Sequence, residues 1–161
     1  MIKTLESFDI QKLMEYYSLI NSQIYWVNYD KCKQSSLQYK DNEDSKISGL
    51  GKGNGKDLQY DNLNPFYKNT IFEEVINKYN LKRTRLMLVE PWSCYSMHRD
   101  TSPRVHIPLI TNPECYFVFK DSGLVQHLPI GNVYWVDTTK HHTFINCSAE
   151  QRLHLMGSVE N

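Results

Sequence analysis

The chain has 161 residues, and its 18 lysines and arginines are balanced by 18 aspartates and glutamates. This length suits one domain with a hydrophobic core, so we expect a single domain over residues 1–161. A net charge of zero predicts no general attraction to nucleic acid or to anionic membranes, so we expect neither as a partner. No signal peptide or membrane span is visible and no cysteines form a C-x-x-C pair, which favours a cytoplasmic setting; oligomeric state is not indicated.

The first 80 residues predict helices and a long loop. Apolar residues recur at helical spacing over residues 9–21, and Thr70 to Glu73 has the capping-box pattern that begins a second helix. Residues 24–29 predict a short strand, whereas residues 31–62 are polar and predict a loop. We expect residues 40–62 to be a mobile lid over a site. Glycines 49, 51, 53 and 55 could suggest a phosphate cradle, but G-K-[ST] is absent.

From residue 81 onward, strands dominate. Short runs of β-branched and aromatic residues are separated by turn residues such as Asn112-Pro113 and Asp121-Ser122-Gly123. Many short strands with regular turns are typical of a β-sandwich or barrel, and the sharp loops favour a jelly roll. The expected strands are 84–89, 104–110, 115–119, 124–128, 133–136, 143–147 and 152–159.

Two histidines and an aspartate in this half have the pattern of a metal site. His98 and Asp100 are two positions apart, so on an extended segment they point to the same face. A further imidazole comes from His141 or His142, which are adjacent, so that at most one of them faces the metal. Two histidines and one carboxylate with open positions form the facial triad of non-haem Fe(II) oxygenases. The open positions would take O₂ and a co-substrate.

Arg152 is a candidate for binding an anion. Alternation along Gln151 to Leu155 puts Arg152 and His154 on the face of the metal ligands, which is the interior of the barrel. An arginine is almost never fully buried without a partner, and no acid nearby in the sequence is an obvious one. A ligand carboxylate would pair with the guanidinium through two parallel hydrogen bonds. Arg104 and His106 also share one face of their strand.

The second half of the chain resembles the 2-oxoglutarate- and Fe(II)-dependent oxygenases, most of all the aspartyl/asparaginyl β-hydroxylase-like branch that includes some free-proline hydroxylases. Arg104-Val105-His106 matches the R-x-H of that branch, and residues 137–146 match its D-x-x-x-x-H-x-x-x-N when His142 is the histidine. Arg152 then follows His142 by ten positions, the usual spacing. Asp100 departs from the animal peptidyl-aspartate hydroxylases, which lack this carboxylate, and agrees with the proline hydroxylases.

The resemblance implies a mainly β fold, a double-stranded β-helix of the jelly-roll or cupin-like type with flanking N-terminal helices. It implies that Fe(II) binds to His98, Asp100 and His142. It also implies that Arg152 anchors the distal carboxylate of 2-oxoglutarate, with His106 contacting the same co-substrate and Arg104 holding a carboxylate of the substrate. The expected enzyme is a dioxygenase that uses O₂ to hydroxylate an amino acid or a peptidyl side chain, with succinate and CO₂ as co-products.

Two other readings of the motifs stay open. A cupin-like metal-binding protein or isomerase would not use 2-oxoglutarate and would tolerate loss of Arg152. A nucleic-acid demethylase also has H-x-D and a distal histidine, but it carries a second arginine soon after the first, and Arg152 is the last arginine of this chain. A non-catalytic binding module on the same fold is disfavoured because all three ligand positions are filled.

Overall fold

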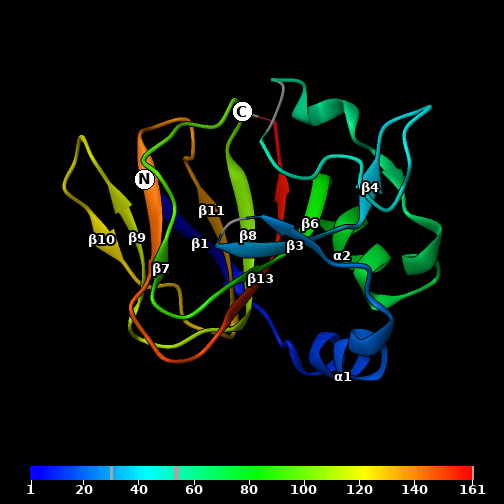
Figure 1. Ribbon diagram of the computed structural model, residues 1–161, viewed down its shortest axis with the longest axis horizontal. Coiled ribbons are helices and arrows are strands. Elements are labelled where there is room, and N and C mark those ends of the chain that lie inside the picture. Colours follow the sequence, from blue (N-terminus) through cyan, green and yellow to red (C-terminus); the bar gives the residue numbers. More distant parts are fainter. Residues whose placement is uncertain (30, 53–54, 161) are drawn as a thin grey trace.

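The computed structural model describes residues 1–29, 31–52 and 55–160. Two antiparallel sheets face each other, and the helices pack on the outer side of the larger sheet (Figure 1). This arrangement confirms the mainly β, jelly-roll fold with flanking N-terminal helices. Among the described residues, none of the helices combines the length and apolar character that crossing a membrane requires.

The larger sheet has seven strands in the order β1-β11-β8-β13-β6-β3-β2. Its centre is formed by β8, β13 and β6, three strands that the sequence predicted within two residues at each end. The strands span Ile2–Ser7 (β1), Asn132–Val136 (β11), Arg104–Ile110 (β8), Arg152–Ser158 (β13), Lys82–Val89 (β6), Cys32–Ser36 (β3) and Val27–Tyr29 (β2).

The smaller sheet has four strands in the order β10-β9-β12-β7. They span Val125–Gln126 (β10), Cys115–Phe119 (β9), His142–Asn146 (β12) and Ser93–Cys94 (β7). Beyond β7, His98 forms an isolated antiparallel bridge with His142. The chain that follows β7 therefore runs beside β12 as far as His98, which lies opposite His142. A separate two-stranded sheet joins Gln38–Tyr39 (β4) to Asn62–Leu63 (β5).

Alternation along the central strands divides the molecule into an apolar outer layer and a polar interior. Leu86, Leu153 and Leu155 point outward, where they form one core with helix residues Leu13 and Phe72. The intervening residues point between the two sheets, as the two-residue period of a strand requires. The interior face of the larger sheet therefore carries the charged and imidazole side chains Arg85, Arg104, His106, Arg152 and His154.

Both predicted helices are present, the first within residues 9–21 and the second beginning just after Thr70. Helix α1 spans Gln11–Ile20 and helix α2 spans Ile71–Lys78, and short 3₁₀ turns occupy Asn21–Gln23, Asp57–Gln59 and Pro65–Tyr67. The Thr70 hydroxyl caps α2 by accepting from the backbone N–H of Phe72 at 3.2 Å. The Glu73 carboxylate accepts from the N–H of Asn69 at 2.5 Å, one residue earlier than in a standard capping box.

The structure corrects the prediction of one continuous loop over residues 31–62. Strand β3 lies in this stretch and pairs with β6, with Gln34, Ser35 and Ser36 all buried. These polar side chains bond inside the protein, for example Ser35 to the Tyr67 hydroxyl at 3.2 Å, so hydrophobicity does not mark the strand. The irregular segment is shorter than expected, and two of its residues, Gly53 of the glycine pattern and Asn54, lie outside the described residues.

Candidate active site

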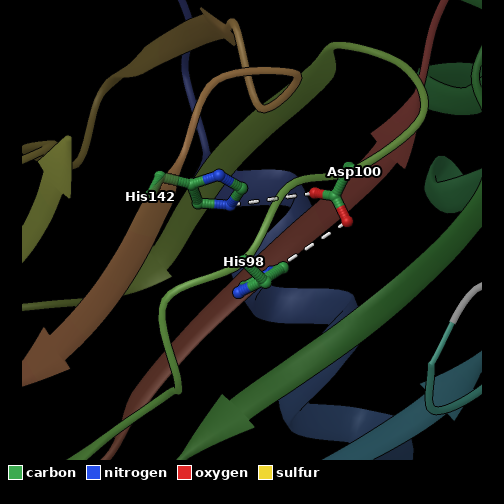
Figure 2. A group of neighbouring side chains, drawn as sticks. All are labelled: His98, Asp100 and His142. Carbon is green, nitrogen blue, oxygen red and sulfur yellow. Dashed lines mark ion pairs between the residues drawn. The ribbon is translucent and has the colours of Figure 1, made fainter. Parts of the chain in front are cut away.

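The structure brings His98, Asp100 and His142 together at one end of the space between the sheets. One potential ligand atom from each residue lies within 4.8 Å of the other two. His142 Nε2 lies 3.8 Å from Asp100 Oδ2, and His98 Nε2 lies 4.0 Å from Asp100 Oδ1 (Figure 2). The two histidines are also joined directly through reciprocal backbone hydrogen bonds of 3.0 and 2.9 Å. Strand pairing thus sets the separation of the two imidazoles.

Each imidazole is held in the orientation that a metal ligand needs. His98 Nδ1 lies 2.8 Å from the carbonyl oxygen of Ser96, and His142 Nδ1 lies 2.9 Å from that of Lys140. In the neutral ring Nδ1 donates to these carbonyls, which leaves the lone pair of Nε2 available to a metal. Burial lowers the pKa of His142, which favours the neutral, ligating form.

The carboxylate of Asp100 is held in place by Arg104. Nη2 of Arg104 donates to Asp100 Oδ1 at 2.7 Å, and the same nitrogen lies 3.4 Å from Asp57 Oδ2. The substrate role that the resemblance implied for Arg104 stays a prediction, but its guanidinium already pairs with two carboxylates of its own chain. It braces a candidate metal ligand.

Asp57 is a site residue that sequence reasoning missed. It is only 3% exposed, and besides Arg104 it accepts from Arg83 Nη1 and Ser158 Oγ, both at 3.0 Å. Its position within a polar, glycine-rich segment looked like part of a solvated loop. Its partners are two buried arginines, Arg83 on β6 and Arg104 on β8, on either side of β13. No spacing rule in the sequence links them to a residue 47 positions before Arg104.

A narrow inner chamber behind the triad contains Arg152. The guanidinium carbon lies 3.7 Å from the centre of the Phe144 ring, and Nη2 contacts Nδ1 of His154. Within the described chain, no carboxylate pairs with Arg152, and its Nε has no hydrogen-bond partner. Burial lowers the pKa of Arg152 from 12.5 to about 9, so it stays cationic at neutral pH. It is a buried cation without a counter-ion, as the sequence predicted.

Two further imidazoles lie close by: His106 lines the same chamber, and His154 lies against Arg152. His106 has no hydrogen bond from either ring nitrogen to the described residues, and His154 has none from Nε2. Burial and the neighbouring Arg152 lower the pKa of both rings well below 6.5, so both are neutral near pH 7. His154 accepts from Arg152 through Nδ1, so its proton is on Nε2.

The inner chamber opens into a wider one. The inner chamber has a volume of about 50 Å³, and the outer chamber, between β3, β6 and the segment leading to the triad, has about 780 Å³. His98, Asp100, Arg104, Met87 and Tyr95 line both chambers. Tyr95 was not predicted, and its buried hydroxyl has no partner among the described residues. The candidate metal ligands therefore lie where the two spaces meet.

His141 lies apart from this site. Its side chain is 41% exposed, and its Nδ1 lies 3.7 Å from Asp121 Oδ2 on the hairpin between β9 and β10. Of the two adjacent histidines, the structure therefore places His142 with His98 and Asp100. His106 and Arg152 line the inner chamber with them, and Arg104 borders both chambers.

Comparison with known families gives a match that covers well over half of the chain. Residues 63–161 match the model of the aspartyl/asparaginyl beta-hydroxylase family. The matched region begins before helix α2 and includes the triad, the R-x-H pattern and Arg152. A search of curated proteins finds no match.

Solved structures of similar fold include two oxygenases. A Pseudomonas putida prolyl-4-hydroxylase superposes with a TM-score of 0.54 at 12% identity, covering 99% of this chain and 92% of that one. A 2OG-Fe(II) oxygenase family oxidoreductase from Burkholderia pseudomallei gives 0.55 at 12% identity, covering 89% and 77%. At such low identity these likenesses establish the fold alone.

Proposed function

Because the chain belongs to the aspartyl/asparaginyl β-hydroxylase family, we propose that it is a 2-oxoglutarate- and Fe(II)-dependent dioxygenase that hydroxylates a C–H bond of an amino acid or a peptidyl side chain. One observation carries the proposal: a cluster of two imidazoles and a carboxylate adjoins a chamber with a buried arginine that has no acidic partner among the described residues. Two histidines and one carboxylate suit Fe(II), and the buried cation suits a carboxylate ligand.

The polar atoms of the inner chamber fit 2-oxoglutarate. Arg152 Nε and both ring nitrogens of His106 are buried and lack partners among the described residues, a costly arrangement unless a ligand supplies them. When bound together, Fe(II), 2-oxoglutarate and O₂ supply oxidative decarboxylation to succinate and CO₂, coupled to hydroxylation of a C–H bond. His98, Asp100 and His142 would hold the metal, and Arg152 would hold the distal carboxylate.

The protein's own contribution is to position and shield these groups. Arg152 at present stacks on Phe144, and a chamber of about 50 Å³ has room for little more than a water molecule or two. The guanidinium therefore has to turn from the ring when a dicarboxylate enters. Arg104 holds the Asp100 carboxylate in place beside the two histidines. The rings of Phe117 and Phe144 give the inner chamber an apolar wall.

Succinate release tests the proposal. Aerobic incubation with Fe(II) and 2-oxoglutarate should form succinate, slowly without substrate and faster with one. Changing His98, Asp100 or His142 to alanine should reduce it to background, because each removes one of three metal ligands. A protein that binds Fe(II) through these residues yet neither binds nor consumes 2-oxoglutarate would instead be a cupin-like metal protein.

A further inference from the structure

A second buried arginine, Arg85, lies in the outer chamber without a counter-ion. It is 2% exposed, and its Nη1 donates only to neutral groups, Gln34 Oε1 at 3.2 Å and the carbonyl oxygen of Gly51 at 3.4 Å. Within residues 1–29, 31–52 and 55–160, Nε has no partner and no carboxylate pairs with the guanidinium. The proposed 2-oxoglutarate site does not use this charge.

The other two buried arginines of this chamber, Arg83 and Arg104, are already neutralised, and its fourth arginine, Arg99, is exposed. Arg83 Nη1 bonds to Asp57, and its remaining donors reach the carbonyl oxygens of Gly49 and Gly51. Arg104 bonds to Asp57 and Asp100. The three buried arginines thus meet two buried or half-buried carboxylates, Asp57 and Asp100, and the surplus positive charge among them belongs to Arg85. Burial, together with Arg104 and Arg83 close by, lowers the pKa of Arg85 well below its ordinary value. An anion beside it would relieve that cost.

Arg85 and Arg152 lie at opposite ends of the interior. Strand β13 runs beside β6 so that Arg152 pairs with Val89 and Met156 pairs with Arg85. Four residues of strand separate the two positions, about 13 Å along the sheet. His98 and Asp100 line the chamber at each end, so the candidate metal lies between the two buried cations. A ligand held by Arg85 would therefore lie on the other side of the metal from one held by Arg152.

We propose that Arg85, oriented by Gln34, receives a carboxylate of the substrate in the outer chamber, and that the substrate is a free amino acid. This inference rests on the proposed function, since it takes the metal as the reacting centre. The planar guanidinium suits a carboxylate. Because Arg85 is buried, we expect its partner to be the terminal carboxylate of a small molecule that enters the chamber. The chamber, about 780 Å³, is large enough for one.

Binding to an inactive form of the protein tests the proposal without turnover. Protein loaded with Zn(II) and 2-oxoglutarate is titrated by calorimetry with each of the twenty free L-amino acids, and with the carboxamide of any that binds. We expect at least one amino acid to bind, its carboxamide to bind far more weakly, and Arg85→Gln to weaken the amino acid by at least about a hundredfold. Affinity for 2-oxoglutarate should be unchanged. Arg85→Lys should recover part of the loss.

Two controls separate this role from a structural one. Lys33→Gln removes a positive charge from neighbouring strand β3 outside the chamber, where Lys33 pairs with Glu90 at 3.4 Å, and it should bind the amino acid as wild type does. Ligand-free Arg85→Gln should melt at or above the temperature of wild type, because the lost charge had no carboxylate partner. A lower melting temperature with unchanged amino-acid binding would make Arg85 structural.

The outcomes distinguish the two proposals. If 2-oxoglutarate binds the Zn(II)-loaded protein but none of the twenty amino acids does, Arg85 is not the receptor for such a substrate, and the proposed function stands. The same conclusion follows if an amino acid binds but its carboxamide binds equally well and Arg85→Gln does not weaken its binding. Failure of 2-oxoglutarate to bind wild type would instead overturn the proposed function.

Discussion

At the scale of single residues, the side chains with the clearest roles are those whose polar atoms are held in a fixed direction. His98 and His142 donate through Nδ1 to backbone carbonyls, which leaves Nε2 of each for a metal. Asp100 is fixed by Arg104. Sequence spacing located these residues because a strand of period two places His98 and Asp100 together. It could not reveal what holds them in place.

The adjacent histidines allow a matched test of register. His142→Ala should reduce succinate formation to background, because it removes a proposed ligand. His141→Ala should stay close to wild type, because that side chain is half-exposed and lies beside Asp121, away from the site. Succinate measured for both purified variants decides the matter, and comparable losses in the two would show that the register is wrong.

At the scale of elements, the sequence predicted strands whose outward face is apolar and missed those whose side chains are polar. Strands β8 and β13 were located because Leu153, Leu155 and Ile107 alternate with polar residues. Strand β3 escaped because its buried side chains are amide and hydroxyl groups satisfied by hydrogen bonds. Asp57 escaped because its partners, Arg83, Arg104 and Ser158, come from strands distant in sequence.

Asp57 should anchor the glycine-rich segment to the sheet. Asp57→Asn leaves Arg83 and Arg104 buried with one counter-charge fewer, which should lower the free energy of unfolding by ~3–5 kcal/mol in urea titrations. It should also increase proteolytic cleavage within residues 40–56. The control is Asp61→Asn, whose exposed carboxylate pairs with Lys82 at 3.9 Å and should contribute less than ~1 kcal/mol. Equal effects of the two changes would contradict the anchoring role.

At the scale of the whole molecule, a chain with no net charge concentrates positive charge in its interior. Arg85 and Arg152 are buried without acidic partners among the described residues, and His106 and His154 stay neutral beside them. Composition could not predict this, because acids and bases balance over the sequence while the fold separates them. We therefore expect anions that bind in this interior to stabilise the fold.

This interior makes the metal-free protein sensitive to acid. The pKa values of His106 and His154 are lower in the folded protein than the ordinary 6.5, so the unfolded chain binds more protons below that pH. Stability is therefore present above pH 6.5 and is lost as the pH falls, by about 1.4 kcal/mol per pH unit for each group. His154→Gln should remove the contribution of His154 to this dependence of the free energy of unfolding on pH. Urea unfolding at pH 7.5 and 5.5 measures this, and equal stability at both would refute it.

The central claim is that this is an oxygenase that uses 2-oxoglutarate, and Arg152 tests it most directly. Anaerobic titrations of wild type and Arg152→Ala with Fe(II), followed by 2-oxoglutarate, report both affinities through the weak visible charge-transfer band of the complex. Losing one partner of a desolvated pair costs ~3–5 kcal/mol, so 2-oxoglutarate should bind at least about a hundredfold more weakly while Fe(II) affinity stays the same. If wild type gives no band, or Arg152→Ala binds 2-oxoglutarate as tightly as wild type, the claim is contradicted.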